Sequence, residues 1–179
     1  PTGADLSTAQ WKEVVELVKQ RDLVPFLDMA YQGFADGIKP DAIALDLFAA
    51  SGLQFVVSSS FSKSFSLYGE RVGALTIVDS SKEESSRVLS QLKRVIRSNY
   101  STPPTHGGMV VTTVLGDPAL RAMWTQELGE MRDRIKDMRR GLADRLKARG
   151  LTQDLSFMVR QRGMFSYSGM NTAQVERLQ

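Results

Sequence analysis

Residues 54–63, Gln-Phe-Val-Val-Ser-Ser-Ser-Phe-Ser-Lys, contain a short apolar run that leads directly into serines and a lysine. The run at 54–58 is predicted to be a buried β-strand, and similar runs stand at 23–27 and 74–78. Helices are predicted around these strands, at residues 8–20, 40–51, 82–98 and 109–115. Strands that are apolar throughout and alternate with helices are typical of an α/β sheet covered on both faces. The sequence therefore predicts an α/β fold.

Local signals mark the ends of two of these helices. Ser7 and Gln10 fit a capping box, in which each side chain bonds the backbone N–H of the other residue. Pro40 stands at the first position of its helix, where the missing N–H is not needed, and Gly52 is a typical C-terminal stop. We therefore expect helices to begin at residue 8 and at Pro40.

A long helix is predicted from Asp117-Pro118 to Gly150, because apolar side chains recur at intervals of three and four residues. These side chains are Trp124, Leu128, Met131, Ile135, Met138, Leu142 and Leu146. A coiled-coil partner could cover this stripe, but packing along the same protein is the more common arrangement. The Arg and Lys residues of the helix are expected to face solvent.

The last part of the chain is predicted to hold two short strands and a final helix. The strands are expected at residues 155–159 and 164–167, and the helix is expected to be capped by Asn171 and to run to Gln179. The sequence then starts within a turn and stops within a helix. We therefore expect the chain to be a fragment of a longer protein.

The composition of the 179 residues narrows the class of protein. The formal net charge is only +3, with acidic and basic residues interspersed, which argues against a nucleic-acid partner. There is no cysteine, so disulfides, thiolate zinc sites and thiol nucleophiles are excluded, and no metal is expected. No apolar run reaches the roughly 18 residues of a membrane span and no signal peptide is visible, so we expect a cytoplasmic location without membrane contact.

Six polar side chains follow the first two strands closely: Asp28, Tyr31, Ser58, Ser60, Lys63 and Arg71. Ligands of open α/β sheets bind beyond the carboxyl ends of the strands, so these groups are expected to share one pocket. Pyridoxal phosphate needs such a set. It requires an amine for a Schiff base, an acid that keeps the ring nitrogen protonated, and hydroxyls with a planar cation for the phosphate.

Each of these residues also has an ordinary interpretation. Asp28 could be a turn residue, and Lys63 could be a solvated loop residue. Arg71 could form a surface ion pair with Glu70, and Tyr31 could simply cover the edge of the sheet. Spacing alone therefore leaves a cofactor site and a plain surface both open.

Four longer motifs carry a resemblance to a known family. They are Asp28-Met-Ala-Tyr-Gln-Gly-Phe-Ala35, Ser60-Phe-Ser-Lys63 with Leu67-Tyr-Gly-Glu-Arg-Val-Gly73, Arg97-Ser-Asn-Tyr-Ser-Thr-Pro-Pro104 and Arg162-Gly-Met-Phe-Ser-Tyr-Ser-Gly169. In these motifs the chain resembles the class I aminotransferases, specifically the aspartate and aromatic amino-acid aminotransferases of pyridoxal-phosphate fold type I. The resemblance extends over nearly the whole chain.

The resemblance implies a domain organisation. Residues 1–115 would form the later part of a cofactor-binding large domain with a mostly parallel sheet, and residues 116–149 would form a long interdomain helix. Residues 150–179 would begin a smaller α/β domain that is truncated. Pro1-Thr2-Gly3 would be the tail of the family's Asn-Pro-Thr-Gly turn.

The resemblance also implies a reaction. This is the ping-pong, pyridoxal-phosphate-dependent transfer of an amino group between an L-amino acid, aspartate or aromatic, and a 2-oxo acid such as 2-oxoglutarate. Lys63 would form the Schiff base with the cofactor and then move a proton. Asp28 would pair with the pyridinium nitrogen, and Tyr31 would bond the ring hydroxyl oxygen. The phosphate would be bound by Ser58, Ser60 and Arg71.

Three more residues are implied to bind the substrate in a homodimer with shared active sites. Arg97 would reach across the dimer to the distal carboxylate of the substrate, which a guanidinium fork suits, and Ser101 belongs to the same cross-subunit segment. Phe165 would line the substrate entrance. The ordinary interpretations are a helix-end arginine that binds terminal carbonyls and a phenylalanine of the core.

Two other functions stay open at this point. One is a different fold-type I activity, such as a decarboxylase or lyase, against which Arg97 and its motif argue. The other is a structural piece that does not catalyse as it stands. The 179 residues alone are expected to be inactive, because parts of the implied site fall outside them.

Overall fold

The computed structural model of the chain describes residues 2–178. Pro1, at the start of the expected turn, and Gln179, at the expected end of the last helix, lie outside the described residues. Helix α1 (Thr8–Gln20) begins as the capping box predicts, because Ser7 Oγ accepts the N–H of Gln10 and Gln10 Oε1 accepts the N–H of Ser7 at 2.8 Å.

The three expected strands form one sheet in the order β1 (Phe26–Met29), β2 (Phe55–Ser60) and β3 (Gly73–Val78). Strands β1 and β2 are parallel, whereas β2 and β3 are antiparallel. The sheet is therefore mixed, and the expectation of a mostly parallel sheet does not hold for these three strands. The cause lies in the connections: a helix joins β1 to β2, but the segment between β2 and β3 holds only turns, and β3 returns beside β2 in the opposite direction.

One face of the sheet is covered by α1 and α2 (Ile43–Ala50), which follows a short 3₁₀ turn η1 (Pro40–Ala42). Four buried side chains form the core between these layers: Val15, Phe48, Phe55 and Val57. Pro40 does open this helical stretch, although as a 3₁₀ turn, and Gly52 lies just beyond the end of α2 with a φ of +75°. The α/β expectation is thus confirmed.

The opposite face of the sheet is open. Phe26 on β1 and Leu75 on β3 point to this face, and 65% and 55% of their surfaces are exposed. No described element covers these side chains, so the expectation of helices on both faces is wrong for residues 2–178. Asp28 belongs to the same face, because side chains alternate along a strand and Phe26 and Asp28 are two residues apart.

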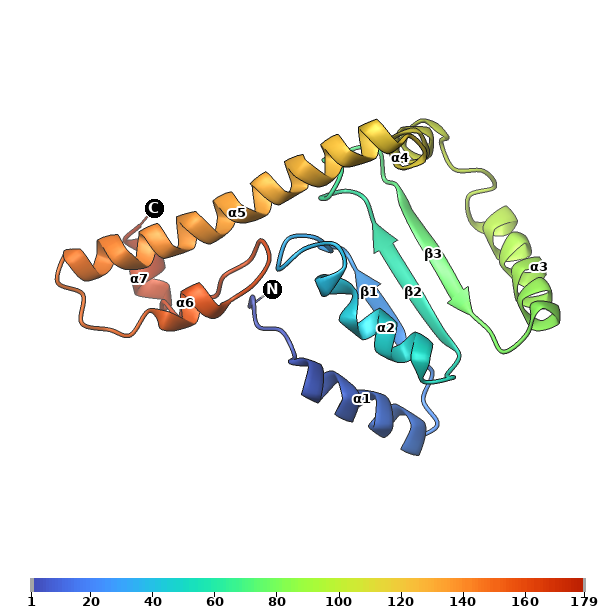
Figure 1. Cartoon of the computed structure of the whole chain (residues 1–179), viewed down its shortest axis with the longest axis horizontal. Coiled ribbons are helices and arrows are strands. Elements are labelled where there is room, and N and C mark those ends of the chain that lie inside the picture. The colour runs from blue at the N-terminus through green and yellow to red at the C-terminus, as the bar shows by residue number, and fades with distance from the viewer. Residues whose placement is uncertain (1, 179) are drawn as a thin grey trace.

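Beyond the sheet the chain is helical (Figure 1). Helix α3 (Lys82–Asn99) lies past β3, and α4 (His106–Gly116) leads into α5 (Pro118–Ala148), the long helix that the apolar stripe predicts. Helix α5 begins where the Asp117 carboxylate accepts two backbone N–H groups, and a glycine at 150 with a φ of +87° follows its end. Within the described part of the chain, no helix is both long enough and apolar enough to cross a membrane.

The two strands expected after Gly150 are not present. Residues 156–160 form the short helix α6 (Ser156–Arg160), because the Asp154 carboxylate accepts the N–H and hydroxyl of Ser156 and starts a helical turn. Residues 164–167 have no regular secondary structure. A short apolar run is equally compatible with a buried helix and a strand, so its pattern could not decide. Helix α7 (Thr172–Glu176) has the expected Asn171 cap but ends at Glu176.

Candidate functional site

The parallel pairing of β1 and β2 brings two of the predicted residues together. Asp28 stands opposite Ser58 in the register, and Ser58 Oγ donates a hydrogen bond to Asp28 Oδ1 at 2.9 Å. Both side chains lie on the open face of the sheet, near the carboxyl ends of the two strands. The Asp28 carboxylate is therefore oriented by a neighbouring strand and is still accessible, which a simple turn residue would not require.

Lys63 lies just beyond the end of β2, in a turn that the chain holds at two points. The N–H of Ser62 donates to Ser60 Oγ at 3.2 Å. On the other side, Trp124 Nε1 of α5 donates to the carbonyl of Ser64 at 2.7 Å, and its ring stacks on Phe65 with the ring centres 4.6 Å apart. The turn around Lys63 is thus anchored to the long helix, unlike a free surface loop.

The Lys63 side chain points back towards β1. Its Nζ lies 4.5 Å from the centre of the Tyr31 ring, a cation–π contact. On its other side Tyr31 meets Phe165 edge to face, with ring centres 5.3 Å apart and planes at 83°. The structure therefore brings the amine, the phenol, the acid and the serine hydroxyls to one end of the sheet, together with the aromatic ring from the C-terminal segment.

Arg71 stands close to the same end of the sheet. The N–H of Phe61 donates to the carbonyl of Val72, so the two strand ends run side by side here. The Arg71 backbone has a φ of +52°, and its Nη1 donates to the carbonyl of Tyr68 at 2.9 Å. Within residues 2–178 no ion pair joins it to Glu70, so the ordinary interpretation of a surface pair is not what the structure shows.

Arg97 and Ser101 do not join this group. They lie at the end of α3, where Arg97 Nη1 donates to Ser101 Oγ at 2.5 Å, and both residues are exposed. Figure 1 shows α3 on the far side of β3 from β1. The chain by itself therefore keeps these two residues apart from Lys63.

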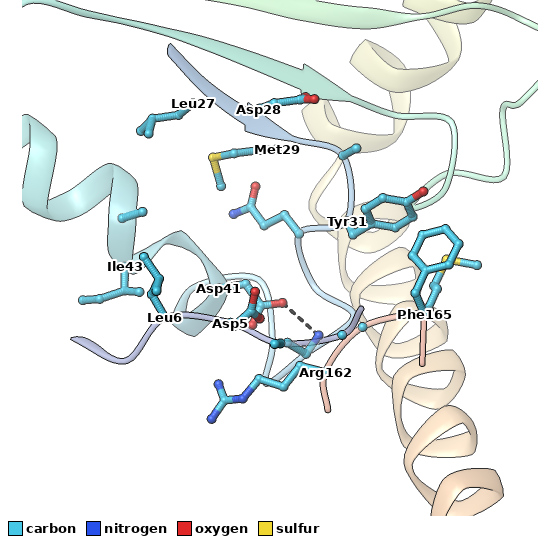
Figure 2. Close-up of a pocket in the computed structure, with 18 of the residues that line it drawn as sticks. Asp5, Leu6, Leu27, Asp28, Met29, Tyr31, Asp41, Ile43, Arg162 and Phe165 are labelled. Carbon is cyan, nitrogen blue, oxygen red and sulfur yellow. Dashed lines mark hydrogen bonds between the residues drawn. The ribbon is translucent and has the colours of Figure 1, made fainter. Parts of the chain in front are cut away.

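A cleft of about 680 Å³ opens next to the group, between the N-terminal segment, β1, the loop after β1 and residues 162–165. Asp28, Tyr31 and Phe165 line it, and Figure 2 shows the Tyr31 and Phe165 rings side by side at one end. Lys63 is not among the lining residues, but its Nζ contacts the ring of Tyr31, which is one of them. In the described chain, no cluster of three or more acidic or histidine side chains is placed to hold a metal.

Two residues that shape this site were not predicted. The Asp41 carboxylate accepts the N–H groups of Gly33, Ala35 and Asp36 and holds the loop after β1. Arg139 of α5 is only 8% exposed and donates to backbone carbonyls of the segment that carries Phe165. The expectation that all bases of α5 face solvent is wrong for Arg139.

A signal for Arg139 was present in the sequence. It stands four residues after Ile135 and three before Leu142, so on a helix it lies beside the apolar stripe. A charged residue next to such a stripe is exposed only if nothing packs there. Here the segment after α6 packs over Arg139, and no signal in the sequence predicts this packing.

Comparison with known proteins relates the chain to one family. The sequence profile of the family described as aminotransferase class I and II matches residues 1–179. An aspartate aminotransferase from Pseudomonas aeruginosa is 65% identical over 178 residues, which are 99% of this chain and 45% of that protein. An aromatic-amino-acid aminotransferase from Escherichia coli is 51% identical, with the same coverage.

A solved structure is also similar over the whole chain. The aromatic-amino-acid aminotransferase from Burkholderia pseudomallei, solved covalently bound to pyridoxal phosphate, superposes with a TM-score of 0.98 at 68% identity. The match covers 99% of this chain and 45% of that one. The chain thus spans a little under half the length of the relatives it matches.

Proposed function

Because the chain belongs to the class I and II aminotransferase family, we propose that the full-length protein transfers an amino group between an L-amino acid and a 2-oxo acid such as 2-oxoglutarate. Relatives named for aspartate and for aromatic amino acids are similar to this chain at 65% and 51% identity, so both substrate classes belong to the proposal. The observation that carries it is the Lys63 amine beside the Tyr31 ring, at the end of the strands that pair Asp28 with Ser58.

The residues present fit pyridoxal phosphate as a cofactor. The ends of β1 and β2 offer an amine, a phenol and an accessible carboxylate, and the serines and Arg71 follow at the same end of the sheet. The donor set is therefore the one that this group requires. When bound, pyridoxal phosphate supplies an electron sink for negative charge at the substrate α-carbon.

In this proposal Lys63 and Tyr31 act at the aldehyde side of the cofactor. Lys63 would hold the cofactor through its amine and, once substrate frees it, accept and return a proton at the substrate α-carbon. Tyr31 would donate its hydroxyl to the ring oxygen. Its ring contacts Lys63 Nζ and would keep the amine directed towards the reacting carbon.

Asp28 would hold a proton on the ring nitrogen. The hydroxyl of Ser58 already donates to Asp28 Oδ1, so we assign Ser58 to orienting this carboxylate. Because its one O–H is used in this way, Ser58 Oγ could bind another group only by accepting a hydrogen bond. Ser60 uses its oxygen to accept the N–H of Ser62, which leaves its O–H to donate to a phosphate. Arg71 uses one donor on Tyr68, and the rest of its fork would bind the same anion.

We further propose that the protein is a homodimer and that Arg97 and Ser101 serve the active site of the second subunit. Their exposure at the end of α3, away from Lys63, supports this arrangement.

We also propose a division into domains. The later part of a large domain would be formed by residues 1–115, and a long interdomain helix by residues 116–149. The start of a small domain would be formed by residues 150–179. We also propose a cytoplasmic location, since a chain without cysteine does not depend on an oxidising compartment.

The test is a transamination assay on the full-length protein with aspartate or phenylalanine as donor and 2-oxoglutarate as acceptor. We expect activity with at least one donor, and Lys63→Ala should lower kcat by at least about a thousandfold. Lys82→Ala, on the exposed start of α3, is the matched control and should leave kcat unchanged. Release of carbon dioxide or ammonia in place of a new amino acid would instead support a decarboxylase or lyase.

A further inference from the structure

Arg139 is a buried cation on α5, and its partners are all backbone oxygens. Its guanidinium donates to the carbonyls of Gln161, Gly163 and Phe165, the second at 2.7 Å. Among residues 2–178 no carboxylate lies within ion-pair distance of it. Burial lowers the pKa of Arg139, because the guanidinium is partly removed from water. A cation in such a place is tolerated because charge-assisted hydrogen bonds replace the water that it has lost.

Those carbonyls belong to a segment that, within residues 2–178, has no neighbouring strand to bond them. Backbone oxygens in a folded chain need hydrogen-bond donors, and the Arg139 fork supplies the donors that a neighbouring strand would otherwise offer. On the other side, the N–H of Arg162 donates to the carbonyl of Gly3 at 2.7 Å. A Cβ at Gly3 would stand 2.5 Å from the carbonyl oxygen of Phe165. The backbone of the segment is therefore held between α5 and the N-terminal residues, while the side chains of Met164 and Phe165 remain partly exposed.

A third contact fixes the segment from the loop after β1. Asp36 accepts hydrogen bonds from Arg162 and from Lys136 of α5, the latter at 3.3 Å. These side chains are about half exposed, so the pairs add less than the buried Arg139 does. Arg139 is thus the main side-chain support of residues 161–165.

Phe165 is the residue whose ring this support places. Its carbonyl is bound by Arg139, and its ring meets the Tyr31 ring edge to face. Phe165 and Tyr31 both line the 680 Å³ cleft, and Tyr31 contacts Lys63. A shift of the segment would therefore change the apolar wall of the cleft without touching Asp28, Ser58 or Lys63.

We propose that Arg139 is a positioning residue that sets the place of the Phe165 ring and thereby the preference of the site for aromatic over small dicarboxylic substrates. An aromatic side chain relies on apolar contact with this wall, whereas a dicarboxylate relies on charged groups elsewhere. The part of the proposal that concerns substrate preference rests on the proposed function. The part that concerns the placement of the Phe165 ring is independent of it.

The placement is tested by fluorine NMR on the full-length protein with 4-fluorophenylalanine at position 165. The Tyr31 ring shifts this resonance, and Tyr31→Ala defines the value without that shift. We expect Arg139→Gln to move the resonance most of the way to the Tyr31→Ala value, and Arg139→Lys, which keeps the charge but lacks the planar fork, to move it part of the way. Arg140→Gln is the matched control, because Arg140 is exposed and its one ion pair within residues 2–178 is with Asp137, at 3.5 Å.

The kinetic arm separates positioning from general stability. In Arg139→Lys, and in Arg139→Gln if it folds, KM for phenylalanine should rise roughly tenfold while kcat and KM for aspartate change little. An unshifted fluorine resonance in both Arg139 variants, or equal losses for both substrates, would overturn the proposal. A shifted resonance in a protein with no transaminase activity would uphold the positioning role and refute the proposed function instead.

Discussion

The candidate site is built from two regions whose side chains are placed by different means. At the ends of β1 and β2, the pairing of two parallel strands sets Asp28 opposite Ser58, and a short turn carries Lys63 back to Tyr31. In the segment of residues 161–165, by contrast, no strand pairing within residues 2–178 sets the chain, and it is held by the buried Arg139 of α5 and by a backbone bond to Gly3. The first region holds the residues to which we assign the chemistry, and the second lines one side of the cleft beside it.

The largest effect on activity is expected at Asp28, in the region at the ends of β1 and β2. Asp28→Asn keeps the shape and can still accept from Ser58, but it cannot hold a proton on a ring nitrogen as a charged acid. We expect full cofactor content, measured by absorbance, and a kcat lowered by about a thousandfold. Asp46→Asn removes an acid paired with Lys39 at 2.8 Å on the surface and should have no such effect. Near-normal turnover in Asp28→Asn would refute the assigned role.

A smaller effect, on stability, is expected at Gly3. Its φ is +79°, and a Cβ would collide with residues 161 and 165. Gly3→Ala should therefore lower the free energy of unfolding by about 1–3 kcal/mol, measured by denaturant titration of the full-length protein.

Gly141 offers a matched control of opposite sign. It lies within α5 with no atom close to the place of a Cβ. Gly141→Ala should raise the free energy of unfolding by roughly 0.5–1 kcal/mol, because alanine favours a helix. If both substitutions had the same effect, the segment would not be held against the N-terminal residues as described.

The smallest effect concerns pH and the start of α6. The pKa of Asp154 is lowered mainly because its carboxylate accepts the backbone N–H of Ser156, and also because it accepts the hydroxyl of the same residue. A lowered pKa in the folded state means that the charged carboxylate stabilises α6 above the ordinary pKa of the acid. This stabilisation is lost as the pH falls through the folded-state pKa, below about pH 4.

Asp154→Asn should remove this dependence. Amide hydrogen exchange of residues 156–160, compared at pH 6 and pH 3, should then change less with pH than in the unaltered protein after correction for the intrinsic exchange rate. Ser156→Ala should act in the same direction, since it removes the hydroxyl donor. An unchanged dependence in both variants would mean that Asp154 does not start the helix.

Much of the fold follows from signals between near neighbours. The capping box at Ser7, the apolar strands and the stripe of α5 all depend on residues a few positions apart, and the structure confirms them. The antiparallel return of β3 was not predicted, because its direction depends on whether the preceding segment folds as a helix.

The candidate site divides in the same way. The residues beyond β1 and β2 could be grouped from sequence because parallel strands end at one edge. Arg139 could be placed beside the apolar stripe of α5, but not with the site, since its role depends on a segment that packs back onto α5 from beyond the next helix. The strand expected at 164–167 failed for the same reason: the Phe165 carbonyl accepts from Arg139 and the Tyr167 carbonyl from the Gln161 side chain, where a strand would have offered backbone donors.

The most direct test of the account is the identity of the lysine that holds the cofactor. The full-length protein, loaded with pyridoxal phosphate, would be reduced with borohydride, digested and analysed by mass spectrometry. The account predicts that the cofactor is fixed to the peptide that contains Lys63, whose amine lies 4.5 Å from the Tyr31 ring. Cofactor fixed to Lys82 or Lys93 on α3, with Lys63 unmodified, would contradict it.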